Sequence, residues 1–501
     1  MNYIPTIGLE IHSELLTKTK MFCGCLNDET ELVANTNVCP VCLAHPGSLP
    51  VANKQAIDLV IKTGLALNCE INKHSKFDRK NYFYPDLPKA YQISQYDQPL
   101  CENGYLVLPE SKKKIGITRI HLEEDTARLS HGINIGDSTQ NGDQRMSVSS
   151  QRESASLVDF NRAGVPLMEL VTEPDFHSAQ EVVEFGQEFQ LILRYLGVSD
   201  ADMEKGHLRL EANISVAPHG SEKLGTKVEV KNLNSFQAVF KAIEYEIKRH
   251  TELLEAGKGN EIVQETRGWN EGAQQTFSQR SKEDAHDYRY FPDPDLPPME
   301  FSNADIEAIH AQIAELPAGR RERLSREYNL SVKQAELLVR DSFLCDFFEE
   351  AVSELKAIQP QGNMELVYNY IASDLQGMQK DSGILIGESK IKPAYIAQIA
   401  ALIGENKISS RVAKDVLRES FNSGVSPQDI VKEKGLEQVS DESALQNIIT
   451  QVLSTHASVV EEYKKGKVTV LQFLVGQVMA KTKGTANPEI VRLLLERELR
   501  N

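Results

Sequence analysis

Carboxylates recur on one face of four segments in which apolar and polar residues alternate, the pattern of half-buried β-strands. They are accompanied by His, Arg, Asn or Lys in "IGLEIH", "RIHLEED", "HLRLEANISV" and "KVEVK". The solvated face of an antiparallel sheet accounts for glutamates in any one strand. Carboxylates that converge from several strands, however, repel one another unless a cation neutralises them, and hard oxygen ligands suit Mg²⁺ bound to phosphates. The pattern therefore indicates either a solvated sheet or a metal–nucleotide site.

Residues 77–95, "FDRKNYFYPDLPKAYQISQ", combine basic and aromatic side chains with two prolines. The segment has neither the apolar stripe of a helix nor the clean alternation of a strand. Arg79 and Lys80 are followed closely by Tyr82 and Tyr84, and the prolines restrict the backbone after them. We interpret the segment as a stiff loop that holds its cations in place. An aromatic plug that closes the sheet is the alternative.

Four of the seven cysteines lie in two close pairs separated by a short loop: Cys23, Cys25, Cys39 and Cys42. This spacing predicts a tetrahedral zinc site with a structural role, because four thiolates leave no open position for catalysis. The isolated Cys69, Cys101 and Cys345 are expected to be packing residues. An odd number of cysteines in a chain of this length argues against a disulfide framework.

The chain has 501 residues and a formal net charge of −17, which argues against nonspecific coating of nucleic acid. The charge is uneven, since from Tyr463 onward there are eight Lys/Arg against three Glu. We find no apolar run of the roughly 20 residues that a membrane span needs and no signal pattern at the N-terminus. We therefore expect a cytoplasmic protein that does not bind membranes.

The chain is too long for one core, so several domains are expected. Up to about residue 290 it consists of short strands interrupted by amphipathic helices, one from Ser178 to Gly197 and one from Ser235 towards Gly257. We interpret the polar segment 132–155 as a mobile hairpin tip or a partly disordered loop, and "FPDPDLPP", residues 291–298, as a stiff linker. The remainder is helical by pattern. The predicted domains are 1–293, 294–404 and 405–501.

Long motifs spread over the whole chain resemble one family, the B subunits of tRNA-dependent aspartyl/glutamyl amidotransferases. They are "GLEIH", "FDRKNYFYPDLPKAYQISQ", "HLEED", "DFNRAGVPLMELVTEPD", "MEKGHLR", "KNLNSF", "DYRYFPDPDLPP" and "FLVGQVMAKTKGTANP". The resemblance implies an α+β fold, in which a glutamine-synthetase-like antiparallel sheet forms a catalytic cradle followed by all-α linker and tail domains.

The resemblance also implies a reaction. ATP with Mg²⁺ phosphorylates the side-chain carboxylate of Glu or Asp misacylated on tRNA, and ammonia then displaces the phosphate. An amidase (A) subunit supplies the ammonia from glutamine, and a small C subunit completes a heterotrimer. No "GGSSGG" amidase signature occurs in this chain, so the amide donor must be processed by that partner.

Carried over position by position, the resemblance assigns roles to individual residues. Lys80, Tyr82 and Glu124 are the catalytic candidates. The nucleotide-binding candidates are Arg79, Lys80, Arg209, Glu211 and Lys231. The magnesium candidates are Glu10, His12, Glu124, Glu204, Glu211 and Glu229. Arg79 and Lys80 would neutralise the charge that develops as the carboxylate attacks the γ-phosphoryl group. At Glu211 the family often has Asp, and Ala217 stands where Arg is common.

Two other functions remain possible on the residues alone. One is a noncatalytic tRNA-binding scaffold, although a scaffold for a polyanion should not gather carboxylates at its centre. The other is a freestanding ligase for a small molecule, for which the C-terminal helices would be superfluous. Within those helices, "KTKGTANP" places Lys481 and Lys483 in a turn at a helix start, which suits RNA phosphate or a solvated loop.

Overall fold

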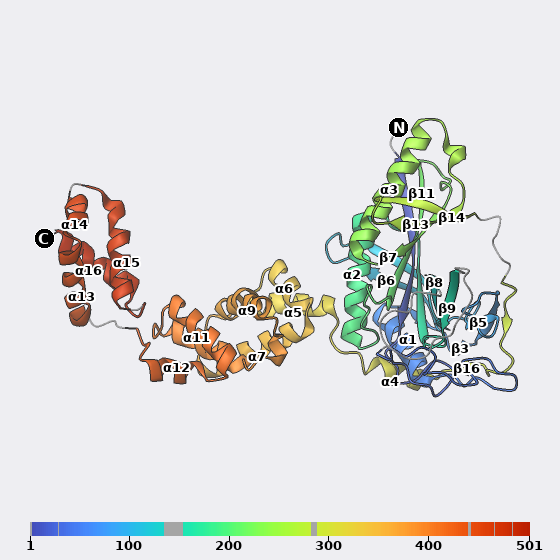
Figure 1. The fold of residues 1–501 in the computed structure, drawn as a ribbon, viewed down its shortest axis with the longest axis horizontal. Coiled ribbons are helices and arrows are strands. Elements are labelled where there is room, and N and C mark those ends of the chain that lie inside the picture. Colours follow the sequence, from blue (N-terminus) through green and yellow to red (C-terminus); the bar gives the residue numbers. More distant parts are fainter. Residues whose placement is uncertain are drawn as a thin grey trace. The chain divides into compact units, whose positions relative to one another are not determined.

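The structure is a computed structural model that describes most of the chain. The described residues are 3–28, 30–134, 154–281, 288–438, 442–464, 466–482 and 484–500. Lys483 and most of the polar segment 132–155, for which the sequence makes predictions, lie outside these ranges. The chain divides into two compact units, Met1–Ala318 and Gly319–Asn501 (Figure 1). No helix in the described ranges is long and apolar enough to cross a membrane.

A nine-stranded sheet forms the centre of the first unit. All neighbouring strands pair antiparallel except β12 and β13, which are parallel. The strand order is β14 (Gln275–Ser281), β13 (Glu265–Asn270), β12 (Val228–Leu233), β11 (Leu208–Pro218), β1 (Tyr3–Glu14), β10 (Pro166–Thr172), β7 (Lys114–Glu124), β6 (Cys101–Val107) and β2 (Glu70–Ile71). The predicted sheet with mostly antiparallel pairing is confirmed.

Helices cover the apolar face of this sheet (Figure 1). They are α1 (Lys54–Ala66), α2 (Ala179–Leu196) and α3 (Phe236–Glu255), with α4 (Asn303–His310) packed on α1. Ser178 caps α2 by accepting a hydrogen bond from the backbone of Glu181, and Gly197 ends it with a φ of 66°. Ser235 caps α3 in the same way, so both helix starts predicted from the sequence are confirmed.

The segment 77–95 contributes to a small three-stranded sheet instead of forming a loop throughout. Its strands are β4 (Asp78–Asn81) and β5 (Tyr91–Ser94), and β15 (Phe291–Pro292) pairs with β4. Further short pairs are β3 (His74–Ser75) with β16 (Met299–Glu300) and β8 (Arg128–Asn134) with β9 (Ser154–Asp159). Because Asp293 and Leu296 are buried in the first unit, residues 291–298 do not form a free linker. The prediction for this segment was wrong.

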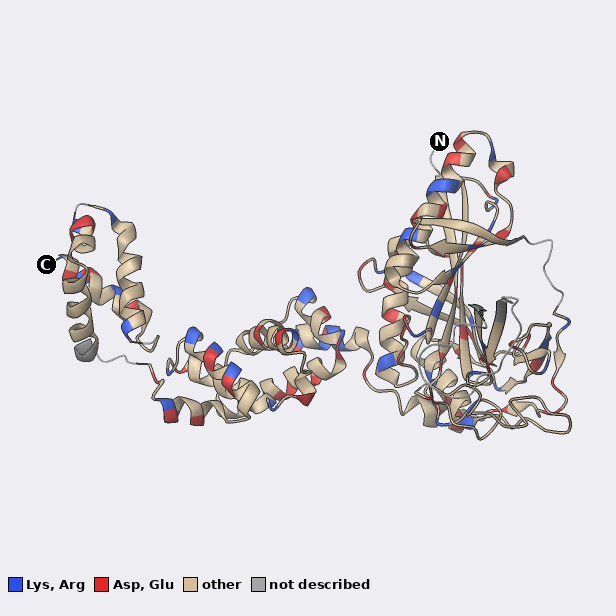
Figure 2. Cartoon of the chain, in the orientation of Figure 1, with Lys and Arg blue, Asp and Glu red and all other residues tan. Residues whose placement is uncertain are grey.

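The second unit is helical in all its described segments. Its helices are α5 (Pro317–Tyr328), α6 (Val332–Val339), α7 (Ser342–Ile358), α8 (Met364–Asn369), α9 (Gln376–Ser382), α10 (Pro393–Gly404), α11 (Ser410–Ser423), α12 (Pro427–Lys434), α13 (Glu442–Thr455), α14 (Ala457–Lys464), α15 (Leu471–Lys481) and α16 (Pro488–Arg500). Helices α13, α15 and α16 share a core of their own, which includes Leu445, Leu474 and Leu495. Both acidic and basic residues lie on the described helices of this unit (Figure 2). The division into three domains stays a prediction.

Candidate active site and cysteine cluster

A cavity of about 830 Å³ lies on the polar face of the main sheet. Strands β1, β7, β10, β11, β12 and β13 line one side, and residues of the segment 77–96, with Tyr288 and Tyr290, line another. Its acidic and histidine residues are Glu10, His12, His121, Glu123, Asp125, Glu169, Glu211, Glu229 and Glu265. Its basic residues are Lys80, Arg119, Arg209, Lys227 and Lys231. The polar strand faces that the sequence predicted therefore do converge.

The first group of possible metal ligands is Glu10, Glu211 and Glu229, each of which offers an oxygen within 4.8 Å of the others. Strand register brings them together, because Glu10 lies directly opposite Glu211 in the β1–β11 pair. Burial raises the pKa of Glu10, and the neighbouring charges of Glu169, Glu211 and Glu229 raise it further. Such crowding of carboxylates is relieved when a cation binds.

Each carboxylate of this first group also has one oxygen held by a neighbouring hydrogen-bond donor or cation. Asn213 Nδ2 donates to Glu10 Oε1 at 3.0 Å. Lys231 Nζ lies 2.7 Å from Glu211 Oε2. Thr266 Oγ1 donates to Glu229 Oε2 at 2.6 Å, across the parallel pairing of β12 and β13. These contacts fix the orientation of the three side chains before any ion is bound.

The second group of possible metal ligands is His12, Glu123 and Glu169. His12 Nε2 lies 3.3 Å from Glu169 Oε2, and His121 Nε2 lies 3.3 Å from the same oxygen. Burial disfavours a charged His121, but the carboxylates of Glu169 and Glu123 outweigh it and raise the pKa of His121 to about 9. His121 therefore supplies positive charge between two buried carboxylates.

Besides Lys231, two more of the predicted cations, Lys80 and Arg209, face the cavity. Lys80 Nζ lies 5.0 Å from the ring centre of Tyr288 and 5.9 Å from that of Tyr82. Burial opposes the ammonium, but the nearby carboxylates of Glu123 and Glu169 raise the pKa of Lys80 above its ordinary value. Lys80 thus stays charged next to the carboxylates.

Arg209 is the second cation. Its Nη2 lies 2.9 Å from Asp125 Oδ2, while Arg162 Nε lies 3.5 Å from the same oxygen. Burial disfavours the guanidinium, but Asp125 and Glu14 outweigh it and raise the pKa of Arg209. Asp125 therefore orients Arg209 at the cavity wall.

Three of the predicted site residues lie outside this cavity. Glu124 points to the opposite side of β7 from Glu123, where Lys89 Nζ lies 2.7 Å from its carboxylate. Arg79 alternates with Lys80 in β4 and pairs with Asp293 at 2.8 Å. Glu204 is exposed in the turn before β11. Strand alternation explains the first two, because successive side chains point to opposite faces.

Residues that the sequence analysis did not assign complete the cavity. Glu123 and Asp125 follow from the alternation in "RIHLEED", which puts them on the face of His121, so the pattern already carried that signal. Glu169 is the single acid in the apolar strand "PLMELVT" and gave no signal of its own. Tyr96 and Tyr290 stack at the cavity with ring centres 4.3 Å apart, although 194 residues of sequence separate them.

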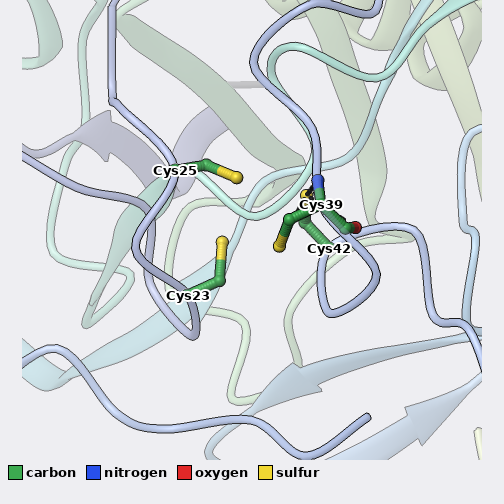
Figure 3. A group of neighbouring side chains, drawn as sticks. All are labelled: Cys23, Cys25, Cys39 and Cys42. Carbon is green, nitrogen blue, oxygen red and sulfur yellow. Dashed lines mark hydrogen bonds between the residues drawn. The ribbon is translucent and has the colours of Figure 1, made fainter.

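The four predicted cysteines gather with their sulfur atoms within 4.8 Å of one another (Figure 3). Cys39 Sγ and Cys42 Sγ are 3.9 Å apart, which matches the roughly 3.8 Å between thiolates at 2.3 Å from a tetrahedral zinc ion. The backbone N–H of Cys39 donates to Cys42 Sγ. Hydrogen bonding from Cys23 and the nearby Lys20 ammonium help to hold the pKa of the Cys42 thiol below its usual range. The geometry fits a zinc ion.

Comparison with known proteins gives matches over both units. Residues 5–307 match the model of the GatB/GatE catalytic domain family, and residues 346–499 match that of the GatB domain family.

The chain also aligns with related proteins over nearly the full length of both. The chain is 48% identical over 502 residues to the B subunit of the aspartyl/glutamyl-tRNA(Asn/Gln) amidotransferase of Persephonella marina, with 100% of both chains covered. It is 46% identical to the protein of the same name from Caldanaerobacter subterraneus subsp. tengcongensis, again with 100% of both covered. It is also 46% identical to that of Carboxydothermus hydrogenoformans, with 99% of both covered.

Proposed function

Because the chain belongs to the family of aspartyl/glutamyl-tRNA(Asn/Gln) amidotransferase B subunits, we propose that the 830 Å³ cavity is where misacylated tRNA is activated and amidated. The chain is the catalytic subunit of a carbon–nitrogen ligase that uses ammonia derived from glutamine. This proposal rests mainly on one observation: two groups of possible metal ligands and the cations Lys80, Arg209 and Lys231 face the same cavity. The sheet is proposed to be of the glutamine-synthetase-like type.

We propose that the cavity holds Mg²⁺ with ATP. The first group, Glu10, Glu211 and Glu229, and the second group of His12, Glu123 and Glu169 would be the ligands. Both groups fit, since hard oxygen donors predominate and their mutual repulsion needs a cation. When bound, Mg²⁺ would neutralise the phosphates of ATP. This proposal moves the metal from Glu124 and Glu204, predicted from the sequence, to residues that face the cavity.

The cations of the cavity are proposed to serve the phosphoryl transfer. An oxygen of the substrate side-chain carboxylate attacks the γ-phosphorus, and the bond to the β–γ bridging oxygen breaks to release ADP. Lys80, Arg209 and Lys231 stabilise the charge on the transferred group, and Tyr82 positions Lys80. Ammonia then attacks the acyl carbon and phosphate leaves. Arg79 supports this wall from behind through its ion pairs with Asp293 and Asp295.

The partners follow from the reaction and the family. We propose an amidase (A) subunit that supplies ammonia and a small C subunit, in a heterotrimer of the cytoplasm where tRNA is used. A freestanding ligase would need its own source of ammonia, which this sequence does not provide. The scaffold alternative is not favoured, since the carboxylates converge in the cavity where catalysis is proposed.

We propose that the C-terminal helices bind the tRNA. The exposed Lys481 ends α15, and the turn that follows leads into α16. The backbone amides of Glu489 and Ile490, however, already donate to the Asn487 side chain at 2.9 and 3.3 Å. The lysines of this turn are therefore the better candidates for phosphate contact than its helix-start amides.

The cysteine cluster is proposed to hold a structural zinc ion. Four thiolates in a closed tetrahedron leave no position for a substrate, so the ion would stabilise the loop region of residues 20–45.

One experiment tests the function. ATP hydrolysis by the complex reconstituted with its amidase partner is expected to require misacylated tRNA. Turnover that proceeds equally well with free glutamate would support a small-molecule ligase, and the absence of any ATP turnover would support a scaffold.

A further inference from the structure

Lys20 exposes none of its side chain to solvent. An ammonium group is rarely buried in this way, because the loss of its hydration must be offset by an anionic partner. Within the described part of the chain, its nitrogen lies 3.1 Å from the carbonyl oxygen of Phe160 and 3.9 Å from Cys42 Sγ. Neither partner is a carboxylate.

The cysteine cluster can supply the missing negative charge. Four thiolates around one Zn²⁺ carry a net charge of about −2, which is itself costly to bury. The Lys20 ammonium touches one of the four ligand sulfurs. We propose that Lys20 is the buried counter-ion of the metal-loaded cysteine cluster, an inference that rests on the zinc occupancy proposed above.

Lys20 also joins the cluster to the loop that shapes the cavity wall. The same nitrogen binds the Phe160 carbonyl, and the Met21 N–H donates to the carbonyl of Gly164 at 2.7 Å. In turn, Gly164 N donates to the carbonyl of Asp125 at 2.9 Å. Asp125 is the residue that orients Arg209 in the cavity. The counter-ion thus ties the zinc site to a loop that supports the proposed active site.

Glu124 is the competing explanation for the buried lysine, because both residues line a smaller cavity of about 260 Å³. Glu124 is already paired, however. Its Oε2 lies 2.7 Å from Lys89 Nζ, and its Oε1 accepts from the backbone of Ile93 at 3.0 Å. The cysteine cluster is the anion that Lys20 contacts.

The test compares Lys20→Met, which keeps the length and apolar stem but removes the charge, with Lys18→Met at an exposed position two residues away. Zinc affinity is measured by competition with a chromophoric chelator. We expect Lys20→Met to bind zinc roughly tenfold or more weakly, since interactions beyond the ligands carry about this weight. Lys18→Met should match the wild type. Equal zinc affinity in all three proteins would overturn the counter-ion role while leaving the zinc site itself intact.

A second measurement separates this role from a purely structural one. Melting temperatures are compared with zinc present and after its removal by chelator. Lys20→Met is expected to melt below the wild type with zinc and no lower than the wild type without it, because the ammonium then lacks its anion. A variant destabilised equally in both states would overturn the proposal. A zinc-free wild-type chain would overturn the zinc assignment and the counter-ion together.

Discussion

Glu123 and Glu124 are consecutive residues of β7, and their side chains lie on opposite faces of the strand. Glu123 faces the large cavity and accepts a hydrogen bond from Ser94 Oγ at 3.0 Å. Glu124 faces the smaller cavity, and Lys89 Nζ lies 2.7 Å from its carboxylate. Only Glu123 of this pair is placed to share a cation with His12 and Glu169.

Substituting Glu123 and Glu124 one at a time tests which of the two binds the metal ion. Glu123→Gln is expected to lower Mn²⁺ affinity roughly tenfold or more, measured by electron paramagnetic resonance with Mn²⁺ as a probe for Mg²⁺, because a charged ligand is lost. The same variant should form almost no amidated tRNA, while glutaminase activity of the complex persists. Glu124→Gln should bind Mn²⁺ like the wild type. Loss of Mn²⁺ binding in Glu124→Gln alone would show that Glu124, and not Glu123, is the metal ligand.

Thr266 is expected to strengthen Mg²⁺ binding by the first group of ligands, because it orients the Glu229 side chain. Thr266→Val keeps the shape but removes the hydroxyl that donates at 2.6 Å, so Glu229 is oriented less well. We expect a roughly tenfold or larger rise in the Mg²⁺ concentration for half-maximal activity, with kcat at saturating Mg²⁺ nearly unchanged.

Two further variants control this experiment. Thr266→Ser should recover the wild-type Mg²⁺ dependence. Thr251→Val removes a hydroxyl that donates to the Ile247 carbonyl within α3, and it should have no effect. A fall in kcat at saturating Mg²⁺ without a change in Mg²⁺ dependence would exclude this positioning role.

The sequence predicts those parts of the site that depend on local alternation. Glu10, Glu211 and Glu229 could be picked out because each lies in a strand whose two faces differ in polarity. Glu124 was predicted as a metal ligand from the family resemblance, although the alternation in "RIHLEED" places Glu123, not Glu124, on the face of His121. Motif similarity alone does not give the strand register.

Long-range pairing accounts for what sequence reasoning missed. Thr266 reaches Glu229 through a parallel strand pair whose members are joined by α3, so nothing near either residue indicates the contact. Arg79 was expected at the phosphates, but its partner Asp293 is 214 residues away in the sequence. The same pairing of β15 with β4 makes residues 291–298 part of the first unit.

A buried ionic network around Glu246 is expected to make the stability of the first unit depend on pH. Glu246 on α3 is fully buried, with Arg249 Nη2 2.7 Å and His250 Nε2 3.3 Å from Oε2, and it accepts a hydrogen bond from Thr276. Burial alone would raise the pKa of Glu246, but the hydrogen bonds from His250, Arg249 and Thr276 lower it to about 2 from an ordinary 4.5. The carboxylate therefore stabilises the folded state at neutral pH.

The sign of the pH dependence follows from this lowered pKa. Stability from Glu246 is fully present above pH 4.5 and is lost as the pH falls towards about 2, up to about 3 kcal/mol. We expect Glu246→Gln to be less stable than the wild type at pH 7, with the difference shrinking below about pH 4.5.

The single tryptophan, Trp269, lies in the first unit, so its fluorescence follows the urea unfolding of that unit alone. The exposed neighbour Glu244→Gln is the control and should show no pH-dependent difference. A difference between Glu246→Gln and the wild type that is constant from pH 7 to about 3 would contradict this account.

Loss of one cysteine ligand should release the metal. Cys39→Ser is expected to reduce zinc from about one ion per chain to well below half, and to lower the melting temperature, because the binding free energy of a structural zinc site contributes to folding. Cys345→Ser, at a buried cysteine far from the cluster in sequence, is the control and should keep its zinc. Elemental analysis of protein purified without chelator decides the outcome.

The C-terminal helices are expected to carry most of the tRNA affinity, and their packing shows where to cut the chain. Helix α10 packs against α11 and α12, so a cut near residue 404 would expose apolar residues such as Ile396 and Ile399. Helices α13, α15 and α16 have a separate core. A chain that ends at residue 438 should therefore keep its fold and its zinc.

This shortened chain, in complex with its partners, should bind tRNA far more weakly than the full chain at matched salt. It lacks all eight basic residues found from Tyr463 onward, including Lys481. Because fewer phosphates are then neutralised and fewer counterions released, the slope of log affinity against log salt should become shallower, by roughly one for each phosphate that the tail neutralises. Filter binding at several salt concentrations measures both quantities, and ATP binding serves as the control for an intact cavity. If the shortened complex bound and amidated tRNA as well as the full one, the tRNA-binding residues of this chain would have to lie within residues 1–438.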